Sequence, residues 1–195
     1  DLNASKGGSA SVELCDRGNE RLQRGAFEAA IRLYDEAIQL KPDYVAAYYN
    51  RGVAHERIGA LSYAIADYTR VIELNPDHVP AYRQRGLAYV RQGDPERAVA
   101  DYTAALERNP DDPVIYHDRA NAHYRAQAFG RAIADYNEAI RRRPDYVEAY
   151  LNRGLAYIAL GDAPRALKDY NQAIALDTER AEVYNYRGQA YAQLE

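Results

Sequence analysis

Apolar and small residues recur along this chain with the spacing of amphipathic helices. Within residues 79–112, the segment AYRQRGLAYVRQG puts Tyr82, Gly86 and Tyr89 on one side of a helix that ends at Gly93. The next segment, PERAVADYTAALERNP, repeats this spacing, carries proline in its first turn and is stopped by an Asn-Pro pair. The pattern therefore predicts a pair of helices joined by a short turn.

The same pattern returns every 34 residues. The tyrosines of the first helices are Tyr48, Tyr82, Tyr116, Tyr150 and Tyr184, and those of the second helices are Tyr34, Tyr68, Tyr102, Tyr136 and Tyr170. This period predicts a flexible segment (1–10) and a single domain (11–195) that holds repeats 11–44, 45–78, 79–112, 113–146 and 147–180 and a lone helix 181–195. A helix pair cannot bury its apolar face alone, so neighbouring repeats must stack around one continuous core.

A helix pair that reads Y-x-x-R-G-x-A-Y-x-x-x-G, then A-I-A-D-Y-x-x-A-I, then P-D resembles the tetratricopeptide repeat (TPR). The resemblance covers residues 11–195. It implies an all-α, right-handed superhelical solenoid of tandem antiparallel helix pairs. His55 and His123 depart from the pattern, and we expect them to pack in the place of an aromatic residue.

Residues repeated in every unit are expected to serve stacking, and recognition should lie where the repeats differ. An arginine recurs from Arg17 to Arg187, and an aspartate recurs one residue before the second-helix tyrosine, at Asp67, Asp101, Asp135 and Asp169. We interpret these two series as repeated Arg–Asp pairs rather than as a phosphate-binding ladder.

Composition narrows the possible functions. The 195 residues include 47% hydrophobic and 28% charged residues, with a net charge of −4, which argues against a general nucleic-acid binder. No apolar run approaches the roughly 18 residues of a membrane span, so we expect a soluble protein without membrane insertion. Arginine far outnumbers lysine, which suggests a bacterial gene, and the cytoplasm and the periplasm both remain open. The chain does not begin with methionine, which indicates a processed product or a piece of a longer protein.

Sequence motifs of catalysis are absent. The chain has no phosphate-binding G-x-x-x-x-G-K loop, no H-E-x-x-H and no G-x-S-x-G. Its four histidines never lie four apart on one helix, and the single cysteine, Cys15, has no histidine nearby in its repeat. We therefore expect no enzyme, no cofactor and no metal site.

The resemblance also implies where a ligand would lie. In the family, first helices line the concave face, and bound peptides touch the second, fifth, sixth, ninth, twelfth and thirteenth positions of each repeat. The candidate peptide-binding residues chosen from these positions are Asn19, Tyr49, Asn50, Arg57, Arg83, Gln84, Leu87, Arg91, His117, Asn121, Arg125 and Asn152. Asn19 and Asn50 match the asparagines of the family's carboxylate clamp for chaperone tails. The basic positions of that clamp hold Cys15, Pro80 and Gln84 instead, so we do not expect a chaperone tail as the ligand.

The groove would combine amides with two other kinds of side chain. Arg57, Arg83, Arg91 and Arg125 form an expected central cationic group near His117, and Leu87, Val90, Leu155 and Ile158 supply apolar patches. This composition suits an extended or helical protein segment with apolar anchors and some acidic groups.

We expect a scaffold that binds a partner protein or peptide along its concave groove without catalysis. The alternative is a self-assembling structural protein that forms homo-oligomers through its C-terminal helix. There Tyr184, Gly188, Tyr191 and Leu194 lie on a face that a second helix covers in the earlier repeats. A third reading is an accessory domain of a larger enzyme or regulator, and a solvated face without a ligand also stays open. The sequence does not identify the partner or the pathway.

Overall fold

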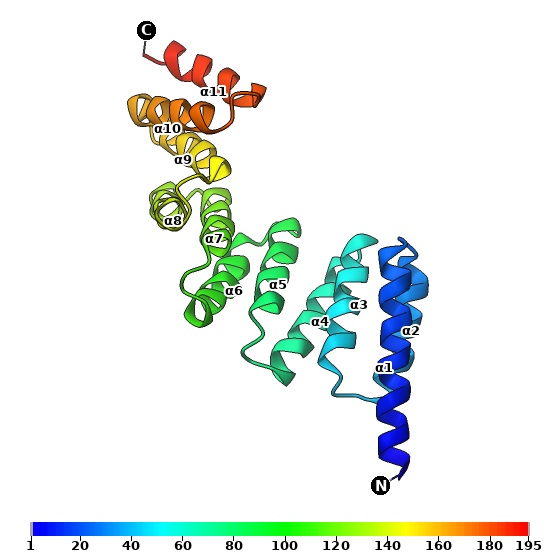
Figure 1. Cartoon of the computed structure of the whole chain (residues 1–195). Helices are drawn as coiled ribbons and strands as arrows, with labels where there is room; N and C mark the ends of the chain where they lie inside the picture. The colour runs from blue at the N-terminus through cyan, green and yellow to red at the C-terminus, as the bar shows by residue number, and fades with distance from the viewer. Residues whose placement is uncertain (1, 195) are drawn as a thin grey trace. The chain divides into compact units, whose positions relative to one another are not determined.

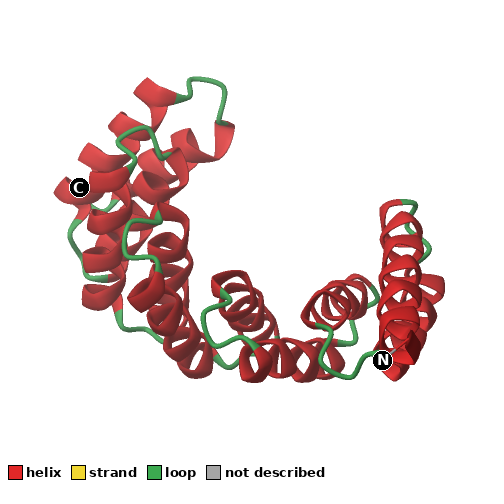
Figure 2. Cartoon of the chain, turned by 60° about the horizontal axis from the view of Figure 1, so that its bottom comes forward, coloured by secondary structure: helices red, strands yellow, loops and turns green. Residues whose placement is uncertain are grey.

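The computed structural model describes residues 2–194, and within them all regular secondary structure is helical (Figure 2). The helices are α1 (Leu2–Gln23), α2 (Phe27–Leu40), α3 (Val45–Arg57), α4 (Leu61–Leu74), α5 (Val79–Arg91), α6 (Pro95–Arg108), α7 (Pro113–Arg125), α8 (Phe129–Arg142), α9 (Val147–Ala159), α10 (Ala163–Leu176) and α11 (Ala181–Ala192). The predicted all-α fold of tandem helix pairs is confirmed.

The helix boundaries follow the sequence period. The first helices α3, α5, α7, α9 and α11 each begin at the first residue of a predicted repeat or of the lone helix. The beginning of the chain differs from the prediction, because α1 starts at Leu2 and includes residues 2–10, which we expected to form a flexible segment. Propagating an existing helix costs little per residue once its nucleus has formed, so weak apolar patterning did not prevent the extension. Asp1 lies outside the described residues.

The helices divide into two compact units, and each is described by itself. The N-terminal unit (Asp1–Asp94) contains α1 to α5, and the C-terminal unit (Pro95–Glu195) contains α6 to α11. The repeat pattern predicted one domain over residues 11–195, whereas this boundary falls between the two helices of the predicted third repeat. Within each unit, consecutive helices pack against one another as antiparallel neighbours (Figure 1).

The second-helix tyrosines form the centre of each helix pair. Tyr34, Tyr68 and Tyr170 are 0% exposed, and each ring lies against a glycine of its first helix. A Cβ atom on Gly18 or Gly154 would lie only 2.5 Å from the tyrosine Cε1 atom, so a side chain there would displace the ring.

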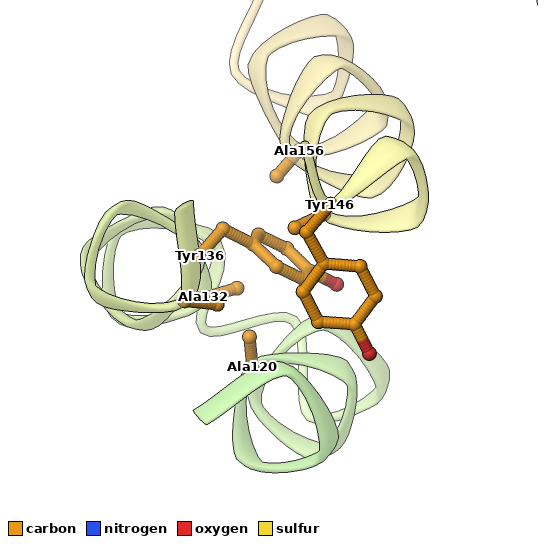
Figure 3. Close-up of a cluster of buried hydrophobic side chains, with 7 residues drawn as sticks. Ala120, Ala132, Tyr136, Tyr146 and Ala156 are labelled. Carbon is orange, nitrogen blue, oxygen red and sulfur yellow. The ribbon is translucent and has the colours of Figure 1, made fainter. Parts of the chain in front are cut away.

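The fourth repeat has alanine at the glycine position. Ala120 and Ala132 are fully buried and lie against Tyr136, beside Tyr146 and Ala156 (Figure 3). Small residues from three helices therefore let the helices approach closely around one aromatic ring.

Three of the four predicted Arg–Asp pairs join helices of the same unit, and all three are present. The nitrogen–oxygen distances are 2.6 Å for Arg51–Asp67, 2.7 Å for Arg119–Asp135 and 2.6 Å for Arg153–Asp169. The same guanidinium groups also reach the preceding second helix, where they contact Asp35 (2.6 Å), Thr103 (3.1 Å) and Asn137 (2.6 Å), respectively. Each arginine thus joins two successive repeats, which is a structural role.

Two histidines join this network. His55 Nδ1 lies 3.0 Å from Asp67 Oδ2, and His123 Nε2 lies 3.8 Å from Asp135 Oδ2. Burial lowers the pKa of His123, and the cations Arg119 and Arg131 lower it further, although Asp135 opposes this shift. Both histidines are half-buried in the position of the repeated aromatic residue, as expected.

Candidate functional site

Two clusters of hydrogen-bonded polar side chains link successive first helices. In the C-terminal unit, Asn121 Oδ1 on α7 accepts hydrogen bonds from Tyr136 Oη (2.6 Å) and from Asn152 Nδ2 on α9 (3.1 Å). We call these three residues the C-terminal triad. The amide oxygen of Asn121 therefore links α7 to the second helix α8 and to the next first helix α9.

An equivalent arrangement lies in the N-terminal unit. Asn19 Oδ1 on α1 accepts hydrogen bonds from Tyr34 Oη (2.9 Å) and from Asn50 Nδ2 on α3 (2.8 Å). We call Asn19, Tyr34 and Asn50 the N-terminal triad. Both triads occupy the same repeat positions, and in each the two asparagines are separated by 31 residues. The triads are therefore two copies of one device.

The residue at the fifth position of a repeat is a neighbour of each triad. In the C-terminal unit this neighbour is His117, whose Nε2 lies 3.1 Å from Asn152 Nδ2 and whose ring centroid lies 4.9 Å from that of Tyr146. On the other side of the ring, His117 Nδ1 lies 3.4 Å from Asn121 Nδ2 and 3.8 Å from Asp118 Oδ1, so both ring nitrogens face polar side chains.

In the N-terminal unit the corresponding neighbour is Cys15. Its side chain is 2% exposed, and burial raises the pKa of its thiol, while hydrogen bonds with Tyr44 and Asn50 act in the opposite direction. A buried thiol with a raised pKa is a poor nucleophile. Cys15 is therefore a packing residue beside Asn50.

Each triad leaves one amide oxygen without a partner. Among the described residues, no group donates a hydrogen bond to Asn50 Oδ1 or to Asn152 Oδ1, and both side chains are only half-buried. The amide nitrogens are held on the opposite side, so these oxygens have fixed directions. An amide oxygen of this kind can accept a hydrogen bond from the main-chain N–H of another polypeptide.

The second repeat has a variant of the triad. Valine occupies its ninth position, and Tyr68 Oη donates instead to Glu56 Oε2 (2.6 Å), one turn further along α3. Arg91 Nη1 on α5 lies 3.3 Å from the other oxygen of Glu56. Glu56 was not among the residues predicted from the sequence, although valine in place of asparagine at position 53 was a signal for it.

Tyr49 lies next to this variant site. Its ring centroid is 5.7 Å from that of Tyr68 and 5.1 Å from that of His78. Burial and the charge of Glu56 raise the pKa of Tyr49, and the nearby cation of Arg83 partly opposes them. Gln84 and Leu87 are half-buried on α5, the helix that carries Arg83.

The expected central cationic group is divided between the two units. Arg57, Arg83 and Arg91 belong to the N-terminal unit, whereas Arg125 and His117 belong to the C-terminal unit. Glu56 offsets the charge of Arg91, and His117 is only 9% exposed because Tyr146 and Asn152 pack on it. We expected these groups to lie together because the sequence pattern does not show which neighbouring side chains cover each of them. Arg57 and Arg125 are exposed.

An apolar patch adjoins the C-terminal triad. It consists of the half-buried side chains Leu155 and Ile158 on α9 and Tyr186 on α11, which pack with the fully buried Tyr170. Leu155 follows Asn152 by one helical turn. Amide and apolar surfaces therefore lie next to each other on α9.

Residues 2–194 hold neither a membrane-spanning helix nor a cluster of metal-binding side chains. None of their helices is both long and apolar enough to cross a membrane. These residues also contain no cluster of three or more histidine, cysteine, aspartate or glutamate side chains arranged to hold a metal ion.

Family models match almost the whole chain. A model described as TPR repeat matches residues 18–59. Models described as tetratricopeptide repeat match residues 45–78 and the overlapping segments 62–113, 83–147, 117–179 and 151–195. No curated protein gives a significant match.

Solved structures similar to this chain have low sequence identity. A crystal structure of MamA protein is 23% identical, with a TM-score of 0.83 over 90% of this chain and 96% of that chain. A tetratricopeptide repeat protein from Parabacteroides merdae is 21% identical, with a TM-score of 0.86 over 96% of this chain and 74% of that chain. YrrB, described as a TPR protein with an unusual peptide-binding site, is 17% identical, with a TM-score of 0.80 over 91% of this chain and 92% of that chain. These similarities establish the fold.

Proposed function

This chain belongs to the tetratricopeptide-repeat family, and we propose that each of its two asparagine triads binds an extended segment of a partner protein, without catalysis. The observation that carries the proposal is the unpaired amide oxygen in each triad, at Asn50 and at Asn152. The main-chain N–H is the donor that every peptide offers at regular intervals. Such a contact recognises an extended chain whatever its sequence.

The fixed geometry of the amides supports binding. In the C-terminal triad, Asn152 Nδ2 donates to Asn121 Oδ1 and lies 3.1 Å from His117 Nε2, so its side chain is already oriented before a ligand arrives. A preoriented side chain loses little conformational entropy on binding, which favours affinity.

Neighbouring residues suggest the chemistry of the partner. Leu155 and Ile158 offer a half-buried aliphatic surface for an apolar anchor, and exposed Arg125 on α7 offers a cation for an acidic group. In the N-terminal unit, Arg57 is the exposed cation. The peptide-binding site ascribed to YrrB, a similar structure, is consistent with this proposal but does not identify the partner.

Selection from a random peptide library displayed on phage tests the proposal. We expect enriched peptides to bind the wild-type chain and to lose about tenfold or more in affinity with Asn152→Ala or Asn50→Ala, the effect of one lost hydrogen bond. Gln172→Ala is the matched control, because this amide is exposed on α10, away from both triads. Failure to enrich any peptide, or equal binding by all variants, would contradict the proposal.

Self-association through α11 is the second candidate function, and exposed apolar groups favour it. Tyr184, Tyr191 and Leu194 are 41%, 52% and 53% exposed. A Cβ atom on Gly188 would meet nothing within 4 Å, whereas the equivalent Gly18, Gly52 and Gly154 lie against a tyrosine ring. We propose a second copy of this chain as the occupant of this face. Sedimentation velocity should then show a concentration-dependent dimer that Tyr191→Glu with Leu194→Glu abolishes, and a monomer at every concentration would remove this candidate.

A further inference from the structure

We infer that the hydroxyl of Tyr170 makes a second contact with the main chain of the partner. The hydroxyl donates a hydrogen bond to a main-chain carbonyl of an extended aliphatic segment that lies on Leu155 and Ile158. This inference rests on the proposed peptide binding and adds a specificity-determining subsite to it. The subsite lies wholly within the C-terminal unit.

The inference starts from an exception among equivalent tyrosines. The hydroxyls of Tyr34, Tyr68 and Tyr136 donate to Asn19, Glu56 and Asn121, respectively. Tyr170 is 0% exposed, and within residues 2–194 its hydroxyl has no hydrogen-bond partner. A buried hydroxyl without a partner is unfavourable, so a ligand that supplies an acceptor gains a hydrogen bond at little extra desolvation cost.

The reason for the exception lies on α9. The other three hydroxyls reach an acceptor at the ninth or twelfth position of their first helix. In the fifth repeat these two positions hold Leu155 and Ile158, which have no acceptor. By this equivalence the Tyr170 hydroxyl points at the underside of the apolar patch.

The side chains packed beside Tyr170 are partly exposed. Leu155, Ile158 and Tyr186 are each only partly buried, and the Tyr186 ring is stacked on that of Tyr170 at a centroid distance of 6.1 Å. A rotamer change of a partly buried leucine or isoleucine needs no backbone movement. The hydroxyl is therefore within reach of a group that inserts from the surface of α9.

A main-chain carbonyl is the acceptor that fits. A peptide that donates an N–H to Asn152 Oδ1 continues along α9 toward Leu155, about 5 Å away. An extended chain advances about 3.3 Å per residue, so a carbonyl of the next one or two residues comes opposite the Tyr170 hydroxyl. Burying a carboxylate in this apolar surrounding would cost far more desolvation free energy than burying a neutral carbonyl, whose lost hydrogen bond to water the Tyr170 hydroxyl would replace.

Affinity measurements on peptides selected from the same library test the subsite. We expect Tyr170→Phe to weaken the binding of peptides that depend on Asn152 by about tenfold, while circular dichroism and Tm show no loss of folding. Tyr150→Phe is the control, because it also removes one tyrosine hydroxyl, but one that already donates to the Pro144 carbonyl. This variant should bind with wild-type affinity.

Thioamide substitution identifies the carbonyl itself. Sulfur is a weak hydrogen-bond acceptor, so one thioamide in the bound peptide should weaken binding to the wild type but not to Tyr170→Phe, which is the signature of a coupled pair. If Asn152-dependent peptides bind Tyr170→Phe as tightly as the wild type, or if Tyr150→Phe has the same effect, the subsite is wrong and the proposed function stands. If no selected peptide depends on Asn152 or Asn50, the proposed function fails, and this inference fails with it.

Discussion

Equivalent side chains in different repeats meet different partners, and stability should depend on those partners. Tyr136 and Tyr170 are both buried, but Tyr136 donates to Asn121, while Tyr170 has no partner in the described part of the chain. We expect Tyr136→Phe to lower the free energy of unfolding by about 1 kcal/mol and Tyr170→Phe to leave it unchanged or raise it by up to about 1 kcal/mol. Urea unfolding of the two variants measures this difference. Equal losses would mean that both hydroxyls are satisfied.

Arginines of the repeated series should also differ. Arg153 pairs with Asp169, which is only 3% exposed, so Arg153→Met should cost about 3 kcal/mol because it leaves a buried carboxylate without its cation. Arg187 contacts Asn171 at 3.0 Å and the exposed ring of Tyr184, so Arg187→Met should cost less than about 1 kcal/mol. Chemical denaturation compares the two. A small loss for both variants would show that the ladder contributes little to folding.

Among the helices, α9 and α11 have the same sequence pattern but different surroundings. Gly154 on α9 faces the ring of Tyr170, so a Cβ atom there would lie 2.5 Å from Cε1, whereas a Cβ on Gly188 of α11 meets nothing within 4 Å. We expect Gly154→Val to destabilise the fold by about 2 kcal/mol through overpacking. At concentrations low enough to keep the chain monomeric, Gly188→Val should change the free energy of unfolding by no more than about 0.5 kcal/mol, since valine has the slightly better helix propensity.

Thermal and urea unfolding measure the loss in free energy of unfolding for both glycine variants. Comparable destabilisation at both positions would mean that α11 is covered in solution, which is the result expected if a second copy packs on Gly188. The comparison therefore also bears on the proposed self-association.

Over the whole chain, the second-helix tyrosines should make the fold sensitive to alkali. Burial raises the pKa values of Tyr34, Tyr68, Tyr136 and Tyr170 well above their ordinary value of 10.0. Above pH 10 the unfolded chain loses these protons while the folded chain retains them, so the unfolded state binds fewer protons and stability falls as pH rises.

Two optical signals can be recorded together in an alkaline titration. We expect phenolate absorbance near 295 nm to rise in two steps, the second of which coincides with the loss of helical circular dichroism. If all tyrosines ionise near their ordinary pKa while the helices persist, the tyrosines are not buried as described.

Much of the fold was predictable because each repeat has the same local pattern of apolar, small and turn residues. The period of 34 residues placed the starts of α3, α5, α7, α9 and α11, and it indicated the pairs of Arg119 with Asp135 and Arg153 with Asp169. Helix amphipathicity and the turn residues are local, and repetition removes the ambiguity that a single copy would leave. The extension of α1 to Leu2 was not predicted, because its apolar pattern is weak there.

The candidate site depended on packing that the sequence does not express. Residue type and position selected Asn19, Asn50, Asn121 and Asn152, yet only the structure decided which amide atoms are used and that one oxygen in each triad remains unpaired. Tertiary structure likewise paired Arg91 with Glu56, buried His117 and left the hydroxyl of Tyr170 without an acceptor. The physical reason is that hydrogen bonds among side chains of three helices form or fail with differences of a few tenths of an ångström in the distances between the helices. Those distances are set by how successive repeats pack, and the sequence pattern encodes only that they do pack.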